Sequence, residues 1–165
     1  MTAAPDAFDR LGLPRRFDLT VDAIEAAWLS RIVETHPDVD SSGDAASAAL
    51  NDARETLADP RVRADLLLTM FGGPSASEHP ELPDGFLSEI MAIRLEVEAA
   101  VEHRDDVELG RWRDWARSEN QRLTGEIASL FESLELGADR SVREAIRLRL
   151  NVWRYVRRIA DQLGV

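Results

Sequence analysis

The stretch "ETHPDVDSSGD", residues 34–44, separates two helix-compatible segments and decides how the N-terminal part of the chain folds. Pro37 stops the first segment, because proline lacks the backbone N–H that a helix interior uses. Aspartates, serines and a glycine follow it, and these residues favour a turn. The second segment begins at about Asp44. We therefore predict two helices joined by a polar tip that carries His36, Pro37 and Asp38.

The remainder of the N-terminal part is also predicted to be helical. Thr20 is a good N-cap residue, and apolar residues follow it at helical spacing. This apolar face comprises Val21, Ile24, Trp28, Ile32 and Thr35. Proline fits the first position of a helix, so Asp59–Pro60 opens another one. The four predicted helices are Asp6 to Leu11, Thr20 to the tip, about Asp44 to Leu57, and Pro60 to Gly72.

A glycine- and proline-rich segment, "GGPSASEHPELPDG" at residues 72–85, is the best linker candidate. Three longer helices are predicted beyond it: Phe86 to Glu102, Asp106 to Leu134, and Ser141 to Leu163. Their expected start signals are Asp84, Asp105 and a capping box formed by Ser141 and Glu144. The apolar faces of the last two are Trp112, Leu123, Ile127, Leu130 and Leu134, and Val142, Ile146, Leu150, Trp153, Val156 and Leu163. Short turns between helices favour antiparallel packing as a bundle.

Composition excludes several classes of protein. The chain has 165 residues, a formal net charge of −11 and no cysteine. Without cysteine it has no disulfide and no thiolate site for zinc or an iron–sulfur cluster. A negative net charge argues against nucleic-acid binding, which needs cations to displace counterions from phosphates. There is no apolar run long enough to span a membrane and no secretory signal at Met1, so we expect a cytoplasmic protein.

Three interpretations compete for the polar tip. The simplest is a solvated turn after a helix that proline has stopped. A second is a calcium loop, since Asp38, Asp40, Ser42, Gly43 and Asp44 occupy ligand-like places of an EF-hand loop. The twelfth place of such a loop needs a bidentate Glu, and here it holds Ala49, which disfavours tight calcium binding. The third is a recognition tip for another protein, and the surrounding sequence favours it.

The sequence resembles a J domain, and more closely the HscB family of iron–sulfur co-chaperones. "FDRLGLPRRFDLTVDAIEAAW", residues 8–28, is similar to the opening of that family, and His36–Pro37–Asp38 matches the tripeptide that defines J domains. "LNDARETLADPRVRADLLL", residues 50–68, contains the family's D-P-x-x-R-A pattern. "LPDGFLSEIMAIRLEVEAA", residues 82–100, resembles the start of its C-terminal bundle.

The resemblance implies an all-α fold with a J domain at 1–73, a linker at 74–85 and a C-terminal three-helix bundle at 86–165. It implies a co-chaperone that stimulates ATP hydrolysis by a DnaK/HscA-type chaperone and delivers an IscU-like scaffold or another client. No cofactor, metal, nucleic acid or membrane is expected, and no catalytic residue, because no serine lies in a nucleophile elbow. The alternative is a J-like adaptor that has lost chaperone stimulation.

The resemblance also names the binding residues. It assigns chaperone binding to His36, Pro37 and Asp38 together with Arg31, and scaffold or client binding to Leu87, Met91 and Leu95. Two departures weaken the match. The helix before the tip carries one arginine instead of a cationic face, and Glu34 adds the opposite charge. Ala92 and Leu95 stand where the family has acidic residues, and this difference leaves the identity of the client undetermined.

Helical spacing separates two apolar stripes on the segment that follows the linker. Phe86, Ile90, Ile93 and Val97 form the stripe expected to face inward, at steps of four, three and four. Leu87, Met91 and Leu95 form a second stripe, rotated away from the first. One helix of a small bundle buries only one broad face. The second stripe is therefore either a wide core contact or an exposed patch for a partner.

The arginines of the last helix have a simpler interpretation. They are Arg143, Arg147, Arg149, Arg154, Arg157 and Arg158. All 20 basic residues of the chain are arginine, which indicates a compositional bias. Because these six residues are distributed around several sides of a helix, we predict a solvated face and not an RNA-binding one.

Overall fold

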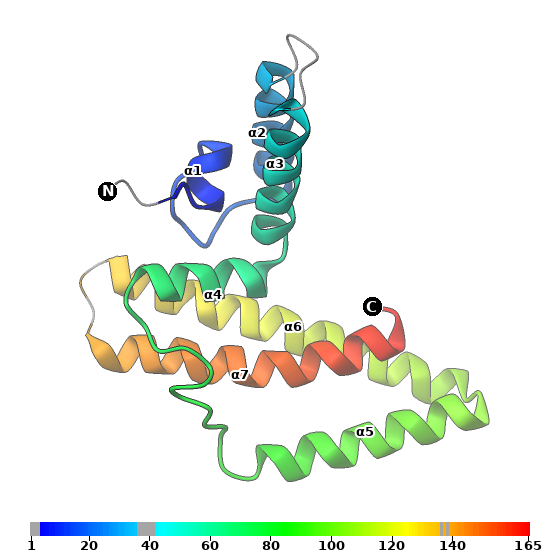
Figure 1. Ribbon diagram of the computed structural model, residues 1–165. Coiled ribbons are helices and arrows are strands. Elements are labelled where there is room, and N and C mark those ends of the chain that lie inside the picture. The colour runs from blue at the N-terminus through cyan, green and yellow to red at the C-terminus, as the bar shows by residue number, and fades with distance from the viewer. Residues whose placement is uncertain (1–3, 36–41, 136, 138) are drawn as a thin grey trace. The chain divides into compact units, whose positions relative to one another are not determined.

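Helices are the only regular secondary structure among the residues that the computed structural model describes, which are 4–35, 42–135, 137 and 139–165. The predicted all-α class is confirmed. Figure 1 shows the helices in chain order. They are α1 (Ala7–Leu11), α2 (Val21–Thr35), α3 (Ser42–Ala58), α4 (Pro60–Met70), α5 (Phe86–His103), α6 (Asp106–Glu135) and α7 (Arg140–Leu163).

Two compact units divide the chain, Met1–Leu67 and Leu68–Val165, so the division falls within α4. The domain limits predicted from sequence, at residues 73 and 85, stay a prediction. The segment predicted as a linker is tied to the second unit. Arg147 Nε donates to the carbonyl of Pro74 at 2.8 Å, and Asn151 Nδ2 donates to the carbonyls of His79 and Glu81 at 2.9 and 3.0 Å.

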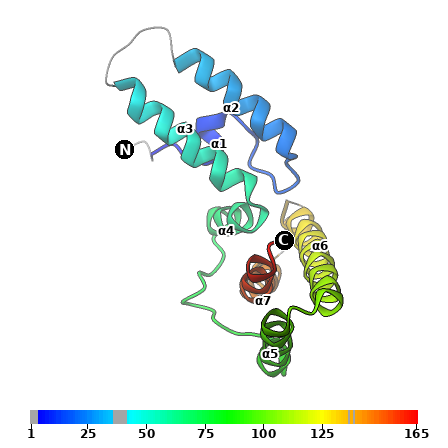
Figure 2. The same ribbon diagram turned by 90° about the vertical axis from the view of Figure 1, so that its right-hand side faces the viewer.

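In the first unit α2 and α3 run side by side in opposite directions, with α1 packed against them (Figures 1 and 2). The core is apolar and includes Phe8, Leu11, Phe17, Ile24, Leu50, Ala53 and Leu57. Val21 was predicted to face this core, but 58% of its surface is exposed. Side chains tilt toward the N-terminus of their helix, so a side chain at the first position projects past the packed turns.

The Asp-Pro-x-x-Arg-Ala pattern at residues 59–64 closes the first unit. Asp59 caps α4, because its Oδ1 accepts from the backbone N–H groups of Arg61 and Val62 at 2.9 and 3.2 Å. Arg63 is buried: its Nε donates to the carbonyl of Phe17 at 2.9 Å, and its Nη1 donates to the carbonyl of Leu57. The pattern therefore joins the loop before α2 to the end of α3.

The second unit contains the long antiparallel pair α6 and α7, with α5 packed along them (Figure 2). The apolar faces predicted for these helices are confirmed in the main, since Leu123, Ile127, Ile146, Leu150 and Val156 are all buried. Trp153 is also buried, and its indole Nε1 donates to Asn120 Oδ1 at 2.6 Å. This hydrogen bond joins α7 to α6 within the core.

Two predicted helix caps are wrong. Gly85, in a left-handed conformation, precedes α5, and no side chain caps it, so Asp84 is not the N-cap. Helix α7 begins one residue earlier than predicted, because Asp139 caps it by accepting from Ser141 N at 2.9 Å. Ser141 thus lies inside the helix, and Glu144 forms no capping box but pairs with Arg140 at 2.6 Å. The cap of α6 is confirmed, with Asp105 accepting from Val107 and Glu108.

We expect the Asp139 cap to make stability depend on pH in the acid range. Hydrogen bonds from the Ser141 side chain and backbone hold the pKa of Asp139 below its usual value. A lowered folded-state pKa contributes stability above the unfolded pKa, and this stability is lost as pH falls through the folded one. Asp139→Asn keeps a side-chain oxygen that can cap the helix and removes the carboxyl group that titrates. Thermal melts at several acid pH values should show a shallower pH dependence for this variant, whereas an unchanged dependence would contradict the assignment.

Candidate protein-binding sites

The tip predicted to bind a chaperone lies between two helices that the structure places well. Helix α2 ends at Thr35 and the antiparallel helix α3 begins at Ser42. His36, Pro37 and Asp38 themselves lie outside the described residues, as does part of the alternative calcium loop. Among the residues that are described, no group of three or more His, Asp or Glu side chains could hold a metal ion.

The helix before the tip presents an apolar outer surface. Leu29 and Val33, one turn apart, are 54% and 76% exposed. Arg31 is the only base in α2, and its Nη1 pairs with Glu34 at 3.1 Å. The same guanidinium lies against Gly12, where an added Cβ would come within 2.6 Å of Nη2. Arg31 is therefore held by its own unit.

The helical hairpin is fixed below the tip by polar contacts between α2 and α3. Trp28 Nε1 donates to Asn51 Oδ1 at 3.0 Å. Arg54 pairs with Glu25 at 2.6 Å, and its guanidinium lies 4.7 Å from the centre of the Trp28 ring. Arg54 thus joins α3 to α2 through both a cation–π contact and an ion pair.

The second apolar stripe of α5 lies outside the core of the bundle. Leu87, Met91 and Leu95 are 49%, 59% and 66% exposed. On the opposite stripe Ile90 and Val97 are buried, as predicted. Helix α5 therefore buries one stripe and exposes the other. The alternative that the second stripe is a core contact of the bundle is wrong.

A groove of about 330 Å³ continues the exposed stripe toward α7. The α5 wall comes from Leu87, Ile90, Met91 and Arg94, and the α7 wall from Tyr155, Arg158, Ile159 and Gln162. Sequence reasoning missed the α7 wall. The available signal was an aromatic residue with arginines directly before it and three residues after it, at Arg154, Tyr155 and Arg158.

The arginines of α7 do not form one solvated face. Arg147 is 4% exposed and Arg149 is half-buried, with its Nε 3.0 Å from Glu126. Their predicted exposure was wrong, because helical position alone does not reveal that residues 74–85 and α6 cover this side of α7. Arg154, Arg157 and Arg158 are exposed as predicted.

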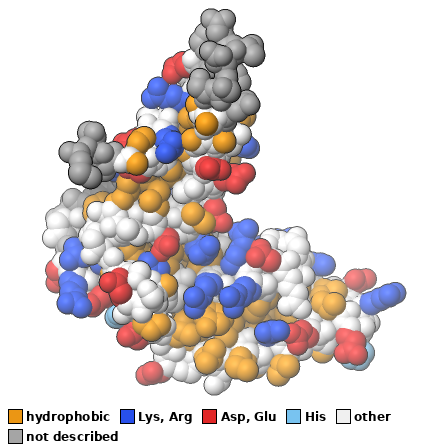
Figure 3. Space-filling view, in the orientation of Figure 1, with side chains coloured by type: hydrophobic (Ala, Val, Ile, Leu, Met, Phe, Trp, Pro, Cys, Tyr) orange, Lys and Arg blue, Asp and Glu red, His pale blue; other side chains and the backbone are white. Residues whose placement is uncertain are grey.

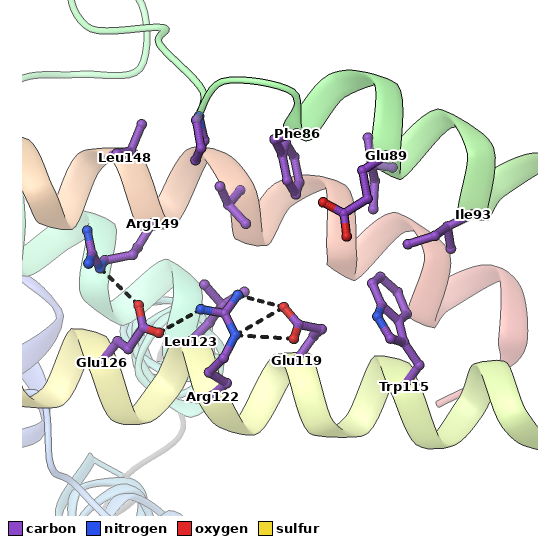
Figure 4. A pocket seen from close by; sticks show the side chains of 13 residues that line it. Phe86, Glu89, Ile93, Trp115, Glu119, Arg122, Leu123, Glu126, Leu148 and Arg149 are labelled. Carbon is purple, nitrogen blue, oxygen red and sulfur yellow. Dashed lines mark hydrogen bonds and ion pairs between the residues drawn. The ribbon is translucent and has the colours of Figure 1, made fainter.

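A second hollow, of about 430 Å³, lies between α5, α6 and α7 (Figure 4). Arg122 projects into it from α6 and pairs with Glu119 and Glu126 of the same helix, each at 2.6 Å, while Arg149 of α7 pairs with Glu126. The hydrogen bonds with Glu119 come first among the causes that raise the pKa of Arg122. Since these charges satisfy one another, they join α6 to α7 and leave the stripe and its groove as the better candidate site.

Relatives of the chain are co-chaperones. No family model matches the sequence. The "Co-chaperone protein HscB homolog" of Bordetella petrii is 31% identical, and the alignment covers 98% of this chain and 96% of that protein. The protein of the same name in Burkholderia multivorans is also 31% identical, over 95% of this chain and 91% of its own length. The chain belongs to the HscB family of co-chaperones.

Solved HscB structures have the same fold. The crystal structure of human co-chaperone protein HscB matches 99% of this chain and 83% of its own, with a TM-score of 0.80 and 19% identity. The structure of chaperone HscB from Vibrio cholerae matches 96% of this chain and 95% of its own, with a TM-score of 0.69 and 21% identity. The first unit of this HscB-family chain is accordingly the J domain, and α5–α7 form the C-terminal helical bundle. None of its helices, over the described residues, is long and apolar enough to cross a membrane.

Proposed function

We propose that this HscB-family co-chaperone stimulates ATP hydrolysis by a DnaK/HscA-type chaperone and brings to it an IscU-like scaffold for iron–sulfur clusters. One observation carries the proposal: the His-Pro-Asp tripeptide stands between antiparallel helices of one unit, and the other unit exposes an apolar stripe. The chain catalyses no reaction itself in this scheme. It binds two proteins and so raises the effective concentration of one near the other.

The chemistry of the tripeptide supports chaperone docking. Proline restricts the backbone at little entropic cost, because its φ angle is already fixed. A carboxylate after it can accept both N–H donors of an arginine fork from a partner. Arg31 is included in this site with a smaller role, since its guanidinium is shared with Glu34. Exposed charges of this kind contribute about 1 kcal/mol or less.

A J-like adaptor without chaperone stimulation is the second candidate, and the surface of α2 favours it. The outer positions Leu29 and Val33 are apolar, and α2 has no cation other than Arg31. Complementary charges mainly raise the rate of encounter. Their loss therefore slows docking without abolishing it, and for this reason we prefer the co-chaperone.

Steady-state ATP hydrolysis separates these two candidates. The purified chain is added to DnaK- and HscA-type chaperones from the same genome, with and without the scaffold. Faster hydrolysis with either chaperone, increased further by the scaffold, is the expected result. If neither chaperone responds while the scaffold still binds, the adaptor is the correct assignment.

Replacing Leu87 and Met91 by Ser should weaken scaffold binding about tenfold or more, because apolar anchors supply much of the energy of an interface. Both side chains are exposed, so the fold should persist. Calorimetric titration gives the affinity, and circular dichroism gives the melting temperature. Val107→Ser is the matched control, since Val107 is 81% exposed on α6 and outside the stripe. Full affinity in a folded double variant would move the client site elsewhere.

A further inference from the structure

The groove beside the exposed stripe carries a charge opposite to that of the whole protein. Two arginines, Arg94 and Arg158, line it, and none of its lining residues is a carboxylate. The full chain has a formal net charge of −11. Figure 3 shows hydrophobic side chains gathered over α5 and α7 with arginines beside them. The groove thus combines apolar walls with positive charge in an otherwise acidic molecule.

Two arginines that lie against Tyr155 of the α7 wall, Arg158 in the groove lining and Arg154 outside it, are not neutralised by the protein. The guanidinium carbons of Arg154 and Arg158 lie 5.3 and 5.9 Å from the centre of the Tyr155 ring. No carboxylate of the described residues lies within ion-pair distance of either one. The neighbouring Arg157 differs, because its Nε pairs with Asp161 at 2.9 Å. Arg94 is also paired, with Glu98 at 2.8 Å.

We propose that this groove binds an apolar protein segment that carries carboxylates, with Arg154 and Arg158 as their partners. This inference rests on the proposed function, since the segment would belong to the scaffold or client. Arginine held against an aromatic ring loses less freedom when it binds a carboxylate bidentately. Tyrosine and arginine are also the residue types that most often dominate the energy of an interface.

The whole-chain charge selects among possible anionic partners. Nucleic acid and anionic membrane present extended negative charge, which the net charge of −11 repels at long range. A short protein segment presents only a few carboxylates, and its apolar residues can occupy the walls formed by Leu87, Met91 and Ile159. An amphipathic helix with acidic residues between its leucines satisfies both requirements.

The first test uses two synthetic peptides. Both are helix-forming, with leucines three and four residues apart, and they differ only in carrying glutamate or lysine between the leucines. Amide resonances of the isotope-labelled full chain are followed during titration. We expect the glutamate peptide to shift resonances of α5 and of residues 154–162, and the lysine peptide to bind about tenfold more weakly. Equal binding of the two peptides would overturn the inference.

Charge reversal identifies the residues responsible. The double variant Arg154→Glu, Arg158→Glu should bind the glutamate peptide about tenfold more weakly and the lysine peptide more tightly. Arg157→Glu is the control for a charge reversal at a neighbouring position of the same helix, and it should leave the affinity for both peptides unchanged. The same variants are titrated with RNA oligonucleotides and anionic vesicles. If the unaltered chain binds RNA or vesicles more tightly than the glutamate peptide, and the double variant loses that binding, the groove is a general site for polyanions. That result would contradict the proposal.

A second titration, with the IscU-like scaffold, separates this inference from the proposed function. Scaffold binding that is weakened about tenfold by the double reversal and unaffected by Arg157→Glu supports both. Scaffold binding that the double reversal leaves unchanged overturns the inference and leaves the function standing. If the unaltered chain does not bind the scaffold, that part of the proposed function fails, and the peptide titration still decides whether the groove prefers acidic segments.

Discussion

Replacement of Asp38 by Asn is expected to remove most of the stimulation of chaperone ATP hydrolysis, by a factor of about ten or more. The substitution keeps the size of the side chain and removes its charge. Charge-assisted hydrogen bonds contribute about 1.5–3 kcal/mol, and about 1.4 kcal/mol corresponds to a factor of ten. Steady-state hydrolysis across a range of co-chaperone concentrations measures both the maximum rate and the concentration that gives half of it.

A matched substitution controls for the change in net charge. Asp52→Asn removes one carboxylate from an exposed position of α3 in the same unit. It should stimulate hydrolysis as the unaltered chain does, and both variants should melt at the same temperature. Undiminished stimulation by Asp38→Asn would show that the tripeptide does not perform the docking. In that case the apolar surface formed by Leu29 and Val33 would become the next candidate.

Local sequence signals were sufficient for most of the fold. Proline at position 37, the capping residues Thr20 and Asp105, and the spacing of apolar residues located the helices to within a few residues. These signals depend on interactions between near neighbours in the chain, which the sequence shows directly. The two stripes of α5 were separable for the same reason, because their rotation about the helix follows from residue number alone.

Contacts between distant residues were not predictable in the same way. Asp139 and Ser141 are both good cap residues two positions apart, and which of them caps α7 depends on the backbone path before the helix. Arg147 was treated as a surface residue, but residues 74–85 cover it and accept its hydrogen bond. Tyr155 and Arg158 meet α5 only through packing of the bundle, so the sequence showed an aromatic residue among arginines but not the groove that they form with α5.

Arg63 is the clearest case of a residue whose role needed the structure. It is one of 20 arginines in a chain without lysine, and composition suggested that any one arginine carries little information. Yet its side chain is 5% exposed and joins two segments that lie far from each other in sequence. The guanidinium also lies 5.2 Å from the centre of the Phe17 ring. Burial lowers its pKa, with Asp59 and Asp18 opposing that shift.

We expect Arg63→Met to destabilise the J domain by about 3 kcal/mol. Methionine can fill much of the volume, but the carbonyls of Phe17 and Leu57 would then be left without this donor. Removing one partner from a buried polar network typically costs about 1–3 kcal/mol, and more when the partner is charged. Arg61→Met is the control, because Arg61 lies on the same helix and its side chain makes no hydrogen bond with another described residue.

Hydrogen exchange measured by mass spectrometry locates the effect within the chain. In Arg63→Met the amides of α2 and α3 should exchange faster, since the contact joins the start of the first unit to the end of α3. Amides of α6 and α7 should be unchanged, because their packing lies within the second unit. Arg61→Met should match the unaltered chain throughout. Normal protection of α2 and α3 in Arg63→Met would mean that neighbouring groups or water satisfy the two carbonyls, and that Arg63 is not what closes the J domain.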